Sequence, residues 1–137
     1  MFLLDTNVVS ELRKAARADP QVRRWAARIS PSALYLSAIS VLELEIGVLR
    51  AERHDPTQGA ILRAWLEGRV FPAFEDRILP IDTAVARRCA QIHIPDPHSD
   101  RDALIAATAL VHSMTVATRN TADFETTGAS LLNPWKT

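Results

Sequence analysis

The sequence predicts an α/β fold in which a mostly parallel sheet is covered by helices on both faces. The chain opens on a short apolar run, MFLL, that stops at Asp5, as a buried strand stops at the edge of a sheet. Another strand pattern, MTVAT, lies near the opposite end of the chain. Between these two runs, segments with strand and helix patterns alternate, and that order is typical of parallel sheets.

The N-terminal half of the chain contains two of the predicted strands. After FLL, Asn7 can cap a helix through VVSELRK, and Pro20 lies near the start of a second helix, QVRRWAARI. Residues 34–36, LYL, form the second strand pattern. Helical spacing returns in VLELEIGVLRAERH, where Ser40 can act as the cap and Glu43 completes a capping-box spacing.

The C-terminal half continues the alternation. DPTQGAILRAWLEGRVFPAF predicts a helix with Pro56 at its start and Pro72 beyond its end. ILPI is a short strand, after which Asp82 or Thr83 can start a helix. An alanine-rich helix, RDALIAATALVHS, leads into the MTVAT strand, and ASLLNPW holds the final short strand.

Length and composition predict one globular domain over residues 1–137. Hydrophobic residues make up 47% of the chain and charged residues 23%, which excludes a disordered composition. No apolar stretch reaches the length of a membrane span and no export signal is visible, so we expect a cytoplasmic protein. A single cysteine, Cys89, excludes an internal disulfide framework.

The net charge is zero, with 16 basic and 16 acidic residues, which argues against a general binder of nucleic acid. The balance still permits an enzyme that acts on nucleic acid through acidic residues neutralised by metal and surrounded by basic ones. Basic side chains outnumber acidic ones near the N-terminus, where they are also compatible with a solvated helix face: Arg13, Lys14, Arg17, Arg23, Arg24 and Arg28.

Four carboxylates lie next to the apolar segments of the predicted sheet. Asp5 ends the first strand and Glu43 lies in the helix after the second. Asp102 begins the alanine-rich helix, and Asp123 follows the MTVAT strand. In a parallel sheet these positions meet at the carboxyl ends of the strands, where like charges repel unless a divalent cation such as Mg²⁺ or Mn²⁺ binds them. The pattern therefore predicts metal-assisted hydrolysis of a phosphodiester.

Local roles compete with this interpretation for two of the four residues. Glu43 can belong to a capping box, and Asp102 can be an acid favoured by the helix dipole. An aspartate that ends a buried strand has no evident packing role, so Asp5 is the candidate that is hardest to explain without a site. A zinc site is a further alternative, from side chains crowded into one proline-containing loop: His93, Asp96, His98 and Asp100.

Four segments, MFLLDTNVVSEL, AISVLELEIGV, DRDALIAATALV and VATRNTADF, resemble the PIN-domain ribonucleases, in particular the VapC-like toxins of bacterial toxin–antitoxin pairs. The resemblance covers nearly the whole chain in the same order, and the closing LLNPW is similar to the last strand of the family. It implies a PIN-like three-layer α/β/α sandwich with a central, mostly parallel sheet of four to five strands.

The resemblance also implies roles for individual residues. Asp5 and Asp102 match the strongest metal ligands, and Glu43 and Asp123 would hold the metal directly or through water. The implied activity is endonucleolytic cleavage of RNA with Mg²⁺, for which Mn²⁺ can substitute. The implied partners are a second copy of the chain and a cognate antitoxin. The chain would contact operator DNA only through this antitoxin, and no membrane partner is implied. Auxiliary polar positions around the metal are matched by Thr6, Ser40, Thr118 and Asn120.

Other classes of protein also place acids at strand ends. A haloacid-dehalogenase-type phosphatase requires an Asp where this chain has Asn7, and a receiver domain requires a lysine after a late strand, where this chain has none. A PIN-like binding module that acts only with an antitoxin on operator DNA, without nuclease activity, remains an alternative. Trp25, Trp65 and Trp135 are candidates for base stacking, although the first two have the spacing of packing residues.

Overall fold

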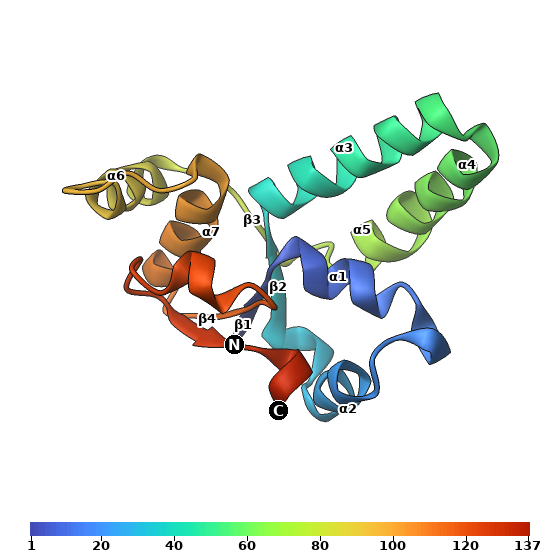
Figure 1. The fold of residues 1–137 in the computed structure, drawn as a ribbon, viewed down its shortest axis with the longest axis horizontal. Helices are drawn as coiled ribbons and strands as arrows, with labels where there is room; N and C mark the ends of the chain where they lie inside the picture. The colour runs from blue at the N-terminus through green and yellow to red at the C-terminus, as the bar shows by residue number, and fades with distance from the viewer.

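The computed structural model describes residues 1–137 and contains a five-stranded sheet in which all neighbouring strands are parallel (Figure 1). Its order is β3-β2-β1-β4-β5, so the N-terminal strand is central. In the register, Leu3 lies opposite both Tyr35 and Val116. This confirms the predicted α/β fold. The strands are β1 (Phe2–Leu4), β2 (Leu34–Ser37), β3 (Ile78–Leu79), β4 (Thr115–Ala117) and β5 (Ser130–Leu132).

An α-helix follows each of β1, β2 and β3, and a turn of 3-10 helix follows β4 and β5. The α-helices are α1 (Thr6–Leu12), α2 (Pro20–Arg28), α3 (Ala38–His54), α4 (Pro56–Trp65), α5 (Phe71–Ala73), α6 (Thr83–Ile92) and α7 (Asp100–Val111). Single turns of 3-10 helix are η1 (Ala15–Arg17), η2 (Pro31–Ala33), η4 (Thr121–Phe124) and η5 (Pro134–Lys136), and η3 (Leu66–Val70) is a π-helical segment. None of the helices combines the length and the apolar composition that a membrane span requires.

The sheet separates two hydrophobic cores, because successive side chains of a strand point to opposite faces. On one face, Leu3 belongs to a core with Val85 of α6 and Ile105 of α7. On the other, Leu4 packs in a core with residues of α1, α2 and α3, among them Val8. Figure 1 shows the same division, with α6 and α7 on one side of the strands and α1 to α5 on the other. The three-layer arrangement predicted from the sequence is therefore confirmed.

Several predicted helix starts are wrong by a few residues. Asp5, not Asn7, caps α1, since its carboxylate accepts a hydrogen bond from the Thr6 N–H. Ser37, not Ser40, caps α3, because the Ser40 N–H donates to the Ser37 hydroxyl. Glu43 therefore lies beyond the first turn of α3, outside any capping box. Its carboxylate is free of the capping role that competed with a place in a site.

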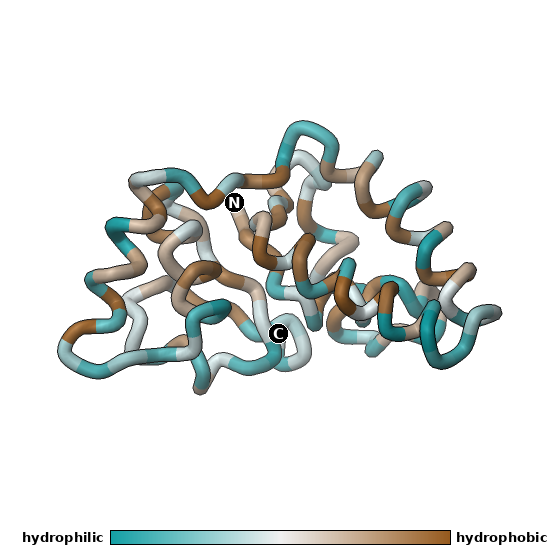
Figure 2. The backbone as a smooth tube through the Cα atoms, turned by 90° about the horizontal axis from the view of Figure 1, so that it is seen from above, coloured by the Kyte–Doolittle hydropathy of each residue, from teal (hydrophilic) through white to brown (hydrophobic).

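The segment after α4 also differs from the prediction. The helix does not end before Pro72, because the π-helical turns of η3 carry the chain directly into α5, which contains this proline. The predicted starts at Pro20, Pro56 and Asp82 are confirmed. Brown and teal segments alternate along the helices in Figure 2, as expected for helices with one buried side.

The α3–α4 hairpin extends from the sheet as a close pair of helices (Figure 1). Gly59 permits this approach, because a Cβ at that position would overlap the backbone of Glu52 on α3. The pair holds α3 firmly, and α3 in turn carries Glu43 to the carboxyl edge of the sheet.

Candidate active site at the carboxyl edge of the sheet

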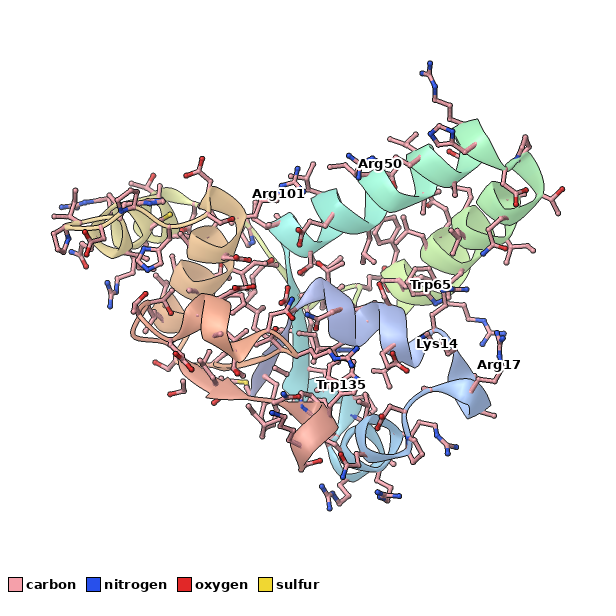
Figure 3. The ribbon with its side chains drawn as sticks, viewed as in Figure 1. Lys14, Arg17, Arg50, Trp65, Arg101 and Trp135 are labelled. Atoms are coloured by element: carbon pink, nitrogen blue, oxygen red, sulfur yellow. The ribbon has the colours of Figure 1, made fainter.

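A cavity of about 520 Å³ opens where β1 and β4 end and where α3 and α7 begin. Three of the four predicted carboxylates line it: Asp5 after β1, Glu43 on α3 and Asp102 on α7. The chain positions of these residues are far apart, and only the parallel arrangement of the strands brings them to one edge. Figure 3 shows the side chains in this region, between the start of α7 and the start of α1.

Asp5 forms the floor of the cavity and is only 7% exposed. Its Oδ1 accepts from the Thr6 N–H (2.9 Å), and its Oδ2 accepts from the Thr118 hydroxyl (2.7 Å) and the Asn7 side-chain amide (3.4 Å). Burial raises the pKa of Asp5 above its ordinary value, and this effect outweighs the hydrogen bonds that lower it. The carboxylate thus also has a structural role as the cap of α1, which the sequence analysis did not predict.

Glu43 reaches the same cavity from the second turn of α3. Its Oε1 accepts a hydrogen bond from the Thr6 hydroxyl at 2.7 Å, so Thr6 joins the Asp5 and Glu43 carboxylates through its backbone and its side chain. Its Oε2 lies 3.7 Å from a guanidinium nitrogen of Arg101, an exposed residue at the start of α7 (Figure 3). This is the one ion pair that any of the four carboxylates makes.

Asp102 is the third residue of α7 and is partly buried. Burial raises its pKa to about 6, and the carboxylates of Asp5, Asp123 and Glu43 add to the shift. The other three carboxylates therefore lie close enough to Asp102 to disfavour its negative charge.

Asp123 belongs to the same electrostatic group but lies at its margin. It is an exposed residue of η4 and does not line the cavity, although its carboxylate raises the pKa of both Asp5 and Asp102. The structure therefore brings three predicted carboxylates into the cavity and leaves the fourth beside it.

The four auxiliary residues take different positions. Thr6 and Thr118 bind the carboxylates directly, and Asn120 lines the cavity while its N–H donates to the Thr118 hydroxyl (3.0 Å). Ser40 is fully buried, and its hydroxyl donates to the Leu4 carbonyl at 3.4 Å instead of to an acid. Ser40 thus connects α3 to β1.

The cavity also contains residues that the sequence analysis did not place in the site. Asn7 bonds Asp5 and Thr118 through its Nδ2 and accepts from the Arg119 N–H through its Oδ1 (3.3 Å). The place of Asn7 in the DTN motif, two residues after Asp5, was a signal from which its position in the site could have been predicted. Arg119 lies two residues after β4, between the predicted Thr118 and Asn120, whereas Trp135 comes from a chain position that no local pattern connects to this strand end. The remaining cavity residues lie along α1 and just after it: Ser10, Glu11, Arg13 and Lys14.

The histidines of the alternative zinc site bond to groups within the chain. His93 Nδ1 accepts from the His98 N–H (3.1 Å) and its Nε2 lies 3.4 Å from Asp100, while His98 Nε2 lies 2.6 Å from the Thr126 hydroxyl. No three His, Cys, Asp or Glu side chains, in this loop or in the acidic cavity, converge closely enough to enclose a metal ion. The loop around Asp96 and Asp100 therefore has no arrangement suited to zinc.

The acidic cavity has a different chemistry, because its ligands are all oxygen and its charge is largely uncompensated. Carboxylates with raised pKa values, backed by hydroxyl and amide groups, suit a hard divalent cation that keeps several water ligands. Asp5 and Asp102 line such a site without forming a closed shell, as is usual for Mg²⁺.

Comparison with known proteins gives consistent matches. The PIN domain family matches residues 2–129. The chain is 40% identical to a VapC ribonuclease of Sinorhizobium fredii, over 99% of each chain, and 40% identical to the toxin FitB of Neisseria gonorrhoeae, over 98% of this chain and 99% of that one. It is also similar to a solved structure of FitAB bound to a DNA fragment, with a TM-score of 0.87, 38% identity and coverage of 98% and 96%.

Proposed function

The chain belongs to the PIN-domain family, and on that premise we propose that it is a divalent-metal-dependent endoribonuclease and the toxin of a toxin–antitoxin pair. The proposal treats residues 1–137 as one PIN domain. The observation that carries it is the cavity in which Asp5, Glu43 and Asp102 meet with little internal charge compensation. A ribonuclease and a toxin among the relatives, each matched over almost its full length, support the same activity.

In this proposal Asp5 and Asp102 are the principal ligands of Mg²⁺ or Mn²⁺, and Glu43 and Asp123 assist directly or through water. When bound, the cation supplies a Lewis acid that neutralises charge on a phosphodiester and lowers the pKa of water. The oxygen-only ligands and the mutual repulsion of the carboxylates favour such an ion over zinc.

The residues of the chain itself position the reacting groups. Thr118 and Asn7 hold Asp5 in one orientation through hydrogen bonds to its Oδ2, and Thr6 fixes the Glu43 carboxylate through a hydrogen bond to its Oε1. Glu43 and Asp123 are placed to orient the attacking water and to accept a proton from it. Arg13, Lys14 and Arg119 line the cavity, and Arg101 lies at its edge, so cationic groups surround the acids on the sides from which a phosphate backbone would approach.

We also propose that the chain assembles with a cognate antitoxin in the cytoplasm and contacts operator DNA only through it. The likeness to FitAB bound to DNA supports this assembly. An apolar groove beside the acidic cavity suits a hydrophobic segment of that antitoxin. Seven of its nine lining residues are hydrophobic: Leu4, Val9, Leu12, Trp65, Val70, Ala73 and Phe74. Arg13 lines both the groove and the cavity, so a partner seated in the groove reaches the edge of the site. Dimerisation of the chain belongs to the same proposal.

Cleavage of RNA by the purified full chain tests the enzymatic function. We expect endonucleolytic cuts in single-stranded RNA with Mg²⁺ or Mn²⁺, no cuts in excess chelator, and recovery when the ion is restored. Cleavage that persists in chelator would contradict the metal-dependent site. A chain that binds its antitoxin and operator DNA but never cuts RNA, with either metal, would instead be a binding module.

A further inference from the structure

Trp135 is the one hydrophobic residue among the twelve that line the acidic cavity. It belongs to η5 near the C-terminus, and in Figure 3 it lies below α1, whereas Arg101 lies above α1. Part of its side chain packs against the core that includes Leu4, and part remains accessible to the cavity. A partly exposed indole in a polar cavity offers a flat apolar surface next to charged groups.

The other two tryptophans lie elsewhere. Trp25 is 3% exposed and meets the Phe2 ring edge-on, with ring centroids 5.2 Å apart. Trp65 lines the apolar groove of α1 and α4, outside the acidic cavity, and the Cζ of Arg13 lies 5.9 Å from its ring centroid. Trp135 is therefore the candidate for a contact with the substrate, and Trp65 supplies a matched comparison.

Arg119 lies over the Trp135 ring, with its Cζ 5.2 Å from the ring centroid. Arg119 is exposed and makes no ion pair with any carboxylate of the chain. The guanidinium and the indole form a cation–π pair that combines positive charge with a flat surface. Such a pair can bind a nucleobase and the phosphate beside it.

Hydrogen bonds fix this pair relative to Asp5. The Asn133 side chain donates to the Arg119 carbonyl (3.5 Å) and accepts from the Trp135 N–H (2.9 Å), so it bridges the two backbones. The Arg119 N–H donates to Asn7 Oδ1, and Asn7 Nδ2 in turn donates to Asp5. One continuous chain of contacts therefore runs from the acidic floor of the cavity to the indole.

We propose that Arg119 and Trp135 form a stacking site for one unpaired RNA base next to the acidic cluster, so that the substrate enters as a single strand. The inference rests on the proposed ribonuclease function and adds two residues that bind a base of the single-stranded RNA. Bases in a duplex are already stacked, whereas bases of loops and single strands are free to stack on aromatic and guanidinium planes. Asn133 and Asn7 are positioning residues, because they act through the pair.

Equilibrium binding separates this site from catalysis. The probes are dye-labelled homopolymeric ribo-oligonucleotides of the four bases, and copies with one abasic position moved along the strand, all measured in chelator to prevent cleavage. For the wild-type chain we expect one abasic position to weaken binding by roughly five- to 150-fold, the range for loss of one stacked base. This measurement needs no variant and so does not depend on the folding of a mutant.

Substitutions of Trp135 then test whether the base that matters for binding is the one that stacks on the indole. Trp135→Leu is expected to weaken binding of the intact oligonucleotide by a similar factor and to abolish the further effect of the abasic position, whereas Trp135→Phe retains most of both. Trp65→Leu removes a tryptophan outside the cavity and should leave the abasic effect intact. Arg119→Ala should make the slope of log K against log salt concentration less steep by about 0.7, the value for one phosphate on a single strand. Arg50 is an exposed arginine on the outer side of α3, and Arg50→Ala should leave this slope unchanged (Figure 3).

The outcomes distinguish the stacking site from the nuclease. An abasic effect of equal size in wild type and in folded Trp135→Leu would overturn the stacking site even if RNA is cut. Base-dependent binding through Trp135 without cleavage in any metal would overturn the nuclease and retain the stacking site. Failure to bind any of the oligonucleotides in chelator would overturn the stacking site, whereas the nuclease is tested separately by cleavage with Mg²⁺ or Mn²⁺. Under steady-state cleavage we expect Trp135→Leu to raise KM far more than it lowers kcat, because the contact exists before and during the reaction.

Discussion

Two clusters of carboxylates in this molecule have opposite electrostatics. On the α3–α4 hairpin, Arg63 bonds Glu45 at 2.7 and 2.9 Å and Glu52 at 3.3 and 3.1 Å, with Glu67 at 3.4 Å. At the carboxyl edge of the sheet, a comparable number of acids meets only the distant Arg101 contact with Glu43. The first cluster contains its own cation, and the second lacks one.

The pKa directions follow from this difference. Hydrogen bonds from Arg63 lower the pKa of Glu52, while burial and neighbouring acids raise the pKa of Asp102 to about 6. A cluster whose acids all bond one arginine of the chain serves to join two helices. A cluster that it leaves uncompensated has charge available for a ligand, and it occurs at the sheet edge where parallel α/β folds bind ligands. The comparison makes the acidic cavity, and not the hairpin, the place to test for function.

Removal of single charges from the cavity should have the largest effect. We expect Asp5→Asn and Asp102→Asn to reduce kcat for RNA cleavage about a thousandfold or more, because each removes a ligand of an ion that stabilises the transition state by several kcal/mol. Asn can still cap α1, so Asp5→Asn should keep the fold. Single-turnover cleavage assays with circular dichroism spectra of each variant provide the measurement.

The matched control lies in the other cluster. Glu45→Gln removes one carboxylate from the Arg63 cluster and should cut RNA at the wild-type rate, because Glu45 does not line the cavity. An equal loss of activity in Glu45→Gln and Asp102→Asn would remove the functional distinction between the two clusters.

The sequence predicted most of the fold because its strands are short apolar runs with clear limits. MFLL and MTVAT became β1 and β4, side by side in the centre of the sheet, and the alternation of patterns was sufficient for the parallel order. The errors occurred at caps, where Asp5 and Asn7, or Ser37 and Ser40, are equally suitable residue types and only tertiary position decides between them.

The site was predictable to the extent that its residues follow strands. Asp5, Glu43 and Asp102 entered the cavity as expected, since parallel strands place their carboxyl ends together. Arg119 follows β4, and Trp135 was one of three candidates for base stacking, but their contact depends on the pairing of β4 with β5 and on the Asn133 bridge. Pairing of distant strands is not encoded in any local pattern.

Metal binding should stabilise only the cluster that lacks a cation. We expect Mg²⁺ at a free concentration of a hundred times its Kd to stabilise the wild-type chain by about 2.7 kcal/mol and so to raise its Tm by several degrees. Asp102→Asn should show little of this shift, whereas Glu52→Gln should show all of it. Differential scanning calorimetry with and without Mg²⁺ measures both, and a Tm of the wild-type chain that ignores the ion would contradict the metal site.

Loss of the internal cation should affect stability without affecting catalysis. Arg63→Met leaves Glu45, Glu52 and Glu67 without their shared partner, so we expect a lower Tm than that of wild type, by less than the shift that Mg²⁺ produces. The rate of RNA cleavage and the Mg²⁺ shift of Tm should both remain at wild-type values. A fall in cleavage rate with an unchanged Tm would instead assign Arg63 to the active site.

The smallest expected effect is the pH dependence of stability, in which the two clusters should have opposite signs. The folded chain holds the Asp102 proton to higher pH than the unfolded chain, so in chelator this group should lower the free energy of unfolding as pH rises from its ordinary pKa of 3.8 to about 6. The lowered pKa of Glu52 acts in the other direction, since its stabilisation is present above its ordinary pKa of 4.5 and is lost as pH falls below it. Urea unfolding in chelator should therefore show that the free energy of unfolding of the wild-type chain declines between pH 4 and 7. This decline should be shallower in Asp102→Asn, and above pH 5 it should be the same in Glu52→Gln as in wild type. Because Mg²⁺ favours the ionised carboxylates, saturating Mg²⁺ should remove the decline from the wild-type chain, and a decline that persists with Mg²⁺ would place its origin outside the acidic cavity.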